Sequence, residues 1–125
     1  MPDTIAVMIS SPGVEAVSTA LDLAVAAASV EMGAHLYFSG AAVIWFSSHG
    51  GAAEAVGAPT GEEREAVLAR LRTAKELGDV KVYACSRAMT AHGIAREDVP
   101  PEVDHPAGLA TFLSLARKAL FTLNF

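Results

Sequence analysis

The chain has 125 residues, of which 52% are hydrophobic and 18% charged, and its formal net charge is −5 at pH 7. This length is typical of one domain with a sizeable core, and the apolar excess excludes a disordered chain. The acidic balance, without any basic stripe along the sequence, excludes nucleic acid as an expected partner.

The sequence also argues against a membrane protein. Asp3 precedes the first apolar run and no basic residue does, which is not typical of a signal peptide. The apolar run Leu23–Val30 is too short to cross a bilayer. We therefore expect a cytoplasmic protein with no membrane partner.

The first third of the chain predicts two buried strands with a long helix between them. Ile5–Ile9 and His35–Ser39 are the strands, because each is a short and nearly continuous apolar run. Ser11 is the expected N-cap of a helix over Pro12–Met32, and Gly33 is its expected stop.

The next segment is less clear. Val43–Phe46 has strand propensity, yet the apolar spacing over Gly40–Ser48 also fits a short helix, which we favour. The glycine-rich stretch Ser48–Gly61 predicts a loop, with a mobile lid as one reading.

The second half alternates helices with strands. Thr60–Glu63 fits a capping box, and the remaining elements follow from apolar runs and turn residues. They are a helix to about Leu77, a strand from Val80 through Val82–Ala84, a short helix from Ser86 to about His92 stopped by Gly93, a strand at Glu102–His105, a helix over Pro106–Lys118, and a final strand over Leu120–Phe125. This alternation predicts a single α/β domain over residues 1–125, a three-layer α/β/α sandwich with a mainly parallel sheet of about five strands.

Cys85, the only cysteine, is the leading candidate for a reactive group. It is expected where a buried strand ends and a helix begins, and the unpaired first N–H groups of that helix favour a thiolate. Arg87 adds a positive charge two residues later. The alternative is an inert, buried cysteine that acts as a small hydrophobic residue. One cysteine also excludes an internal disulfide and a metal site built from several thiolates, and we expect neither metal nor cofactor.

Loops that follow parallel strands share one edge of the sheet, which is where open α/β sheets bind ligands. If the first and third strands are neighbours, the serines after the first strand and Cys85 line one crevice, with backbone amides of Ser86, Arg87 and Ala88 pointing into it. This arrangement suits a persulfide or a bound oxyanion. The predicted ligand-binding residues are Ser10, Ser11, Ser39, Gly40, Ser86, Arg87 and His49.

Alternatives remain open for the histidines and for one tryptophan. His49 could act in the crevice as a base or donor, but we favour a solvated loop position, because loop positions are not fixed by spacing. His105 follows a predicted strand beside a proline turn, and His92 is expected to face solvent or a subunit. His35 is expected only to be the first residue of its strand. Trp45 is expected either to line the predicted crevice or to lie in a subunit contact.

Several stretches carry a family resemblance. They are Val82–Met89 followed by Gly93-Ile94, the stretch Ala107–Leu113, the strand residues Leu36–Phe38 and the hydrophobic end at Phe125. Together they resemble the DsrE/DsrF-like sulfur-relay proteins over almost the whole chain, and the Ala-Cys-x-x-x-Met…Gly-Ile core is the most specific part.

The resemblance implies a compact α/β fold that assembles as dimers, trimers or hexamers, and a single cysteine that carries sulfur as a persulfide. Cys85 matches that cysteine. Donor and acceptor proteins for the sulfur are implied as partners. His105-Pro106 depart from the pattern, because small residues are expected there.

Three functions follow, in this order of preference. The first is a sulfur carrier or sulfurtransferase, since a chain without a second cysteine suits relay to another molecule. The second is a non-catalytic oligomeric module that binds a small anion beside Cys85. The third is a thiol peroxidase, as some relatives are labelled peroxiredoxin-like, but the chain lacks a Pro-x-x-x-Thr-x-x-Cys arrangement. The apolar fraction predicts a homo-oligomer, with Gly40–Ser48 as one contact.

Overall fold

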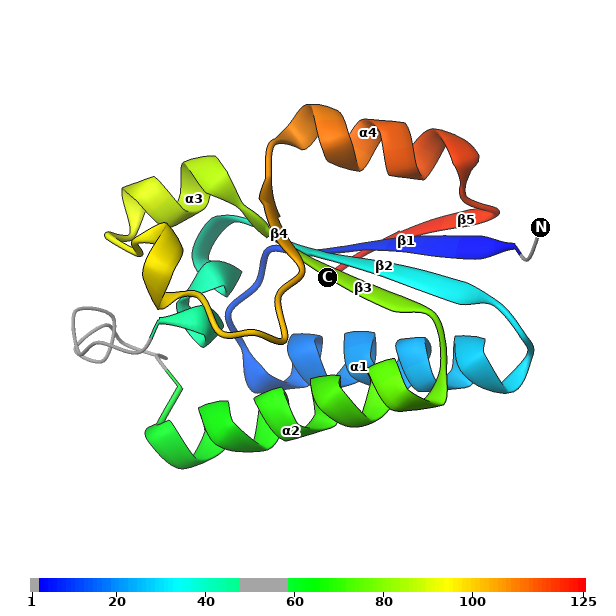
Figure 1. Ribbon diagram of the computed structural model, residues 1–125, viewed down its shortest axis with the longest axis horizontal. Helices are drawn as coiled ribbons and strands as arrows, with labels where there is room; N and C mark the ends of the chain where they lie inside the picture. Colours follow the sequence, from blue (N-terminus) through cyan, green and yellow to red (C-terminus); the bar gives the residue numbers. More distant parts are fainter. Residues whose placement is uncertain (1–2, 48–58) are drawn as a thin grey trace.

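The computed structural model describes residues 3–47 and 59–125, and within these ranges five parallel strands form one sheet in the order β4-β3-β2-β1-β5 (Figure 1). Helices cover both of its faces, so the predicted α/β sandwich is confirmed. The strands are β1 (Thr4–Ile9), β2 (Gly33–Phe38), β3 (Val80–Cys85), β4 (His105–Ala107) and β5 (Phe121–Asn124). The helices are α1 (Val14–Ser29), α2 (Gly61–Leu77), α3 (Ser86–Ala91) and α4 (Leu109–Lys118), with 3₁₀ turns η1 (Gly40–Phe46) and η2 (Arg96–Asp98).

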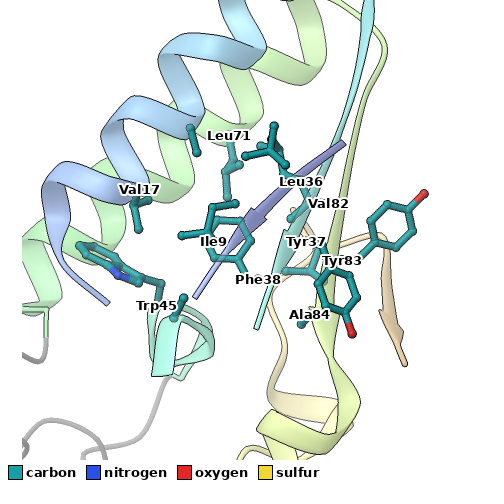
Figure 2. Close-up of a cluster of buried hydrophobic side chains, with 14 of the residues drawn as sticks. Ile9, Val17, Leu36, Tyr37, Phe38, Trp45, Leu71, Val82, Tyr83 and Ala84 are labelled. Carbon is teal, nitrogen blue, oxygen red and sulfur yellow. The ribbon is translucent and has the colours of Figure 1, made fainter. Parts of the chain in front are cut away.

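The main core lies between the sheet and the helices α1 and α2, which pack side by side on one face (Figure 1). Leu36 of β2 pairs in register with Val7 of β1 and Val82 of β3, and all three are fully buried. Val17 of α1 and Leu71 of α2 belong to the same buried cluster and contribute to it from the helices (Figure 2). The three central strands are mostly apolar because parallel sheets are covered on both faces, with Thr4, His35 and Lys81 as the polar exceptions.

Two tyrosines lie on the opposite face of the sheet. Tyr37 of β2 and Tyr83 of β3 pair in register and point away from α1 and α2 (Figure 2). Phe112 of α4 packs on Tyr37 with ring centroids 5.3 Å apart.

The sheet order corrects one premise of the sequence analysis. β2 lies between β1 and β3, so the first and third strands are not neighbours. The loops after β1 and β3 are therefore separated at the sheet edge by the loop after β2.

The predicted bounds of the first helix are also wrong. Gly13 is the N-cap of α1, and Ser11 instead accepts a hydrogen bond from the Gly13 N–H at 3.4 Å. After α1, Glu31 adopts a left-handed φ of 62°, and Gly33 is already the first residue of β2. Gly33 pairs with Thr4 of β1, and a glycine suits this position because a Cβ there would lie 3.2 Å from the carbonyl oxygen of Asp79.

The segment after β2 is helical, as favoured, but most of its apolar side chains are covered by the rest of the chain. The apolar side chains of η1 are buried inside the chain's own fold. Trp45 donates from its indole nitrogen to the carbonyl oxygen of Pro12 at 2.9 Å, and Phe46 packs edge-on against Phe38. The side chains of Ala42–Phe46 are therefore not available for the predicted subunit contact within this fold.

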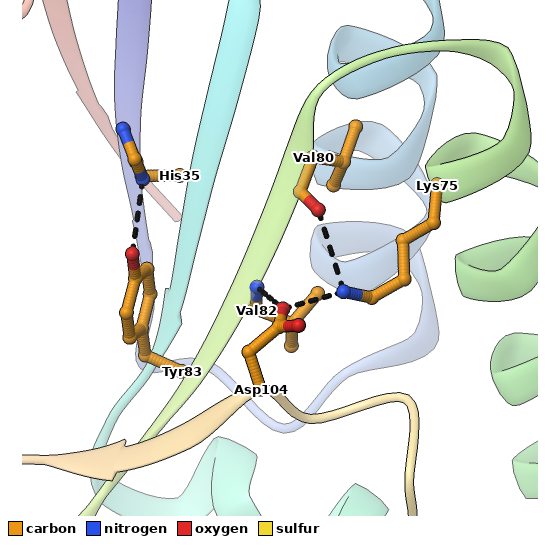
Figure 3. A network of polar contacts seen from close by, with 6 residues as sticks. All are labelled: His35, Lys75, Val80, Val82, Tyr83 and Asp104. Atoms are coloured by element: carbon orange, nitrogen blue, oxygen red, sulfur yellow. Dashed lines mark hydrogen bonds and ion pairs between the residues drawn. The ribbon is translucent and has the colours of Figure 1, made fainter.

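The fourth strand lies later than predicted, over His105–Ala107, and α4 begins only at Leu109. Asp104, just before β4, makes a two-point contact with β3: its N–H donates to the Val82 carbonyl at 2.8 Å, and its carboxylate accepts from the Val82 N–H at 2.7 Å. Lys75 of α2 donates to the same carboxylate (Figure 3). The Asp104 side chain therefore anchors to β3 and α2 the segment that the sequence predicted to be the fourth strand.

In the described ranges, no helix is both long enough and apolar enough to cross a membrane.

Candidate functional site

Cys85 is the last residue of β3 and the N-cap of α3, with extended backbone angles of φ −62° and ψ 116°. Only 4% of its surface is exposed. The chain changes from strand to helix at this residue, so the thiol lies beside the first N–H groups of α3. These groups have no partner within the helix and are available to the sulfur.

A pocket of about 260 Å³ lies against the thiol. It is formed by the loop after β2, by α3 and by the start of α4. The lining residues are Ser39, Gly40, Cys85, Arg87, Ala88, Ala91, His92 and Leu109. The structure thus places three of the predicted ligand-binding residues, Ser39, Gly40 and Arg87, around Cys85.

Burial and nearby hydrogen-bonding groups have opposite effects on the pKa of the Cys85 thiol. Burial, the largest influence, raises the pKa of Cys85, but hydrogen bonds with the Tyr37 side chain, the backbone N–H groups of Ala88 and Arg87, and the Ser39 side chain together leave that pKa below its ordinary value. Arg87 acts here through its backbone N–H. Because α3 has only six residues, these local N–H groups matter more than a helix macrodipole.

Ser39 lies beside the sulfur for two reasons. A hydrogen bond fixes its backbone, and its hydroxyl does not cap the helical turn that follows. Its N–H donates to the Ile9 carbonyl at 2.8 Å, and its hydroxyl makes no capping bond to η1. Gly40 follows with a left-handed φ of 52°, a conformation that side chains disfavour. This glycine turns the chain from β2 into η1 and leaves the Ser39 hydroxyl facing the pocket.

Tyr37 is the principal residue that the sequence analysis missed. It is fully buried, and its hydroxyl donates to the carbonyl oxygen of Ala107 at 3.0 Å. Burial, followed by the hydrogen bond with Cys85, raises the pKa of Tyr37 far above its usual value, so the phenol stays protonated. Strand alternation was a usable signal, because Tyr37 and Ser39 are two residues apart and share a face.

His92 and Leu109 were also missed as pocket residues. His92 is exposed and follows α3, and its N–H donates to the Ala88 carbonyl at 3.0 Å. His92 is the C-cap of α3, as Cys85 is its N-cap, and both line the pocket. Leu109 begins α4 and is 49% exposed.

Other predicted site residues lie elsewhere. Ser10 sits beside the C-terminus, where its hydroxyl donates to the Phe125 carbonyl at 3.3 Å, and Ser11 belongs to the same turn. Ser86 is exposed and does not line the pocket. His49 and most of the predicted lid lie outside the described residues.

The remaining histidines form a separate group on the same sheet face. His35 lies 3.2 Å from the Tyr83 hydroxyl through its Nδ1 atom, and burial lowers its pKa (Figure 3). His105 pairs in register with Tyr83, with ring centroids 6.2 Å apart. Neither histidine lines the pocket beside Cys85. Within the described residues, no group of three or more histidine, cysteine or carboxylate side chains could hold a metal ion.

Comparisons with known proteins agree with this architecture. A solved structure titled "Crystal structure of ychN protein from E.coli" superimposes with a TM-score of 0.64 at 17% sequence identity, covering 100% of both chains. That likeness shows a shared fold. No protein of curated function matches the sequence. A sequence model described as the DsrE/DsrF-like family matches residues 3–125, so the chain belongs to this family, which is generally linked to sulfur relay.

Proposed function

We propose that this protein is a sulfur carrier of the sulfurtransferase type, which relays sulfane sulfur as a persulfide on Cys85. The observation that carries the proposal is the position of Cys85 at the strand-to-helix junction against a pocket, where polar groups of Tyr37, Ser39 and the start of α3 lower the pKa of its thiol. An inert buried cysteine needs no such donors, whereas a thiolate or a persulfide anion does.

The loading step is a thiolate attack on sulfur. The Cys85 thiolate forms a bond to the outer sulfur of a donor persulfide, R–S–SH, and the donor's S–S bond breaks. The products are Cys85–S–SH and the donor thiolate R–S⁻, so no external oxidant or reductant is needed. The volume of about 260 Å³ beside the thiol leaves room for the added sulfur atom.

The unloading step repeats this chemistry with the roles exchanged. An acceptor thiolate attacks the outer sulfur of Cys85–S–SH and takes it, which restores the Cys85 thiolate. Because the chain has one cysteine, the acceptor must be another molecule or another copy of the chain. Arg87 and His92 line the pocket through which that acceptor would reach the sulfur.

Intact-mass measurement after incubation with a sulfane-sulfur donor tests the proposal. The native chain should gain one sulfur atom, and Cys85→Ser should gain none while keeping its fold by circular dichroism. Ser86→Ala is the matched control, since Ser86 adjoins Cys85 but does not line the pocket, and it should load normally. Equal loading of native chain and Cys85→Ser, or no loading of the native chain, would exclude sulfur relay on Cys85.

The low exposure of the thiol favours a second candidate, a non-catalytic module that holds a small anion beside Cys85. In that case Cys85 should resist alkylation in the folded protein and react only after unfolding. Rapid alkylation of the folded protein would exclude this alternative.

A further inference from the structure

The Tyr37 side chain crosses one strand of the sheet to reach another. Tyr37 belongs to β2, yet its hydroxyl bonds to Ala107 of β4, and β3 lies between those strands. Adjacent strands are about 4.8 Å apart, so the side chain and its 3.0 Å hydrogen bond together span roughly 10 Å. Cys85 of β3 is the register partner of Ala107. The hydroxyl therefore ends beside the thiol, between Cys85 and β4.

The hydroxyl of Tyr37 carries one hydrogen, which can be donated to one acceptor at a time. When Cys85 is a neutral thiol, the hydroxyl can donate to the Ala107 carbonyl and accept from the S–H group. A thiolate has no hydrogen to donate, so Tyr37 can bond to it only by turning its own hydrogen to the sulfur. That movement takes the hydrogen away from Ala107.

We propose that the Tyr37 hydroxyl is a two-position switch, which donates to Ala107 while Cys85 is a neutral thiol and to the sulfur once Cys85 is a thiolate or persulfide anion. The thiol proton leaves to water or to an external base, and Tyr37 keeps its own proton in both positions. This inference deepens the proposed function, and it rests on that function only for the persulfide form.

The switch links the charge on the sulfur to the start of α4. Ala107 is the last residue of β4, a three-residue strand at the edge of the sheet. Gly108 and Leu109, the N-cap and first residue of α4, follow at once, and Leu109 lines the pocket. Loss of the bond to Ala107 in the anionic form therefore loosens the rim of the pocket when the sulfur is charged.

Two other titratable or charged side chains line the same pocket, Arg87 of α3 and His92 beyond it. From the edge strand, His105 lies two residues before Ala107. The described part of α4 contributes only Leu109 to the lining. A test must therefore separate the Tyr37 hydroxyl from these groups.

The first test compares two tyrosine-to-phenylalanine variants by the pH dependence of Cys85 alkylation. Tyr37→Phe removes only the oxygen and keeps the ring that packs on Phe112. The pH at which Cys85 alkylation reaches half its maximum rate should rise in this variant, because a hydrogen bond to a charged group is lost. The alkylation rate at neutral pH should fall roughly tenfold. Tyr83→Phe is the matched control, since its hydroxyl faces His35, and its midpoint should not move. Equal midpoints for Tyr37→Phe and the native chain would overturn the switch.

The second test keeps the proposal falsifiable even if Tyr37→Phe folds poorly. In protein labelled with ¹³Cζ-tyrosine, the Tyr37 resonance should shift with the same midpoint as Cys85 alkylation. The shift should vanish in Cys85→Ser and persist in His92→Gln. A Tyr37 resonance that stays constant through the Cys85 midpoint would show that the hydroxyl remains on Ala107. Neither test uses a sulfur donor, so failure of the switch is distinguishable from failure of sulfur loading.

Discussion

Cys85 combines near-complete burial with several hydrogen-bond donors, and these two features have opposite effects on its pKa. Burial alone would keep the proton on the sulfur, as in an ordinary structural cysteine. The donors from β2, from the turn after it and from the start of α3 reverse that outcome. The reactivity of this thiol therefore depends on individual hydrogen bonds, each of which a single substitution can remove.

Removal of the Ser39 hydroxyl should weaken this effect. In Ser39→Ala the thiolate loses one donor, so the pKa of Cys85 should rise and alkylation near neutral pH should slow by a few-fold. Alkylation rates from pH 5 to pH 10 would measure the midpoint. Ser10→Ala is the matched control, because Ser10 is an exposed serine outside the pocket, and its profile should match the native one. A faster or unchanged Ser39→Ala would contradict the role given to Ser39.

At the scale of elements, the contact between Asp104, β3 and α2 holds the segment that leads into β4 (Figure 3). The charged side chains of α2 are thus not all solvated, because some of them bind other elements of the fold. Lys75 donates both to Asp104 and, at 3.3 Å, to the Val80 carbonyl, and Arg72 lies 3.5 Å from the buried carboxylate of Glu102. Polar side chains therefore join α2 and β3 to the segment before β4. These side chains show no regular spacing in the sequence.

This contact predicts a pH-dependent stability. Burial raises the pKa of Asp104, but the hydrogen bonds from Lys75 and the Val82 N–H leave it below its ordinary value. Its stabilisation should be complete above the unfolded pKa of about 3.9 and be lost as the pH falls through the lower, folded pKa. Asp104→Asn keeps an acceptor for Val82 but loses the charge, so it should cost about 1.5 kcal/mol at pH 7 and progressively less as the pH falls through the folded pKa.

Urea unfolding at several pH values would measure this difference. The control is Asp22→Asn, which breaks an exposed pair with Arg70 and should cost no more than about 0.5 kcal/mol. A cost for Asp104→Asn that does not change between pH 7 and pH 2 would show that its carboxylate charge does not stabilise the fold.

At the scale of the whole molecule, the apolar surface left exposed lies partly on α4 and β5. Leu113 is 67% exposed and Phe121 is 56% exposed, whereas the η1 side chains that the sequence suggested as a contact are buried. β5 is also an edge strand, with one side of its backbone unpaired within the described sheet. Both features suit association with another copy of the chain.

We predict that the protein is a homo-oligomer and that Leu113→Glu shifts it to smaller species, because a charge replaces an exposed apolar side chain on α4. Sedimentation velocity at micromolar concentration would measure this. Leu77→Glu is the matched control, since Leu77 is 60% exposed at the end of α2, on the opposite face of the sheet, and its oligomeric state should stay native (Figure 1). A native chain that sediments as a monomer, or equal effects of the two substitutions, would contradict the prediction.

The sequence by itself determined the type and approximate place of most elements and put Cys85 at the end of a strand, because apolar periodicity, caps and turn residues act over a few neighbouring positions. The capping box at Thr60 is confirmed in detail, with hydrogen bonds in both directions to Glu63. Only the tertiary structure decided the strand order, which brings Ser39 and Tyr37 to Cys85 and leaves Ser10 beside the C-terminus. Strand order depends on contacts between residues far apart in the chain, and no local pattern encodes which strand lies beside which.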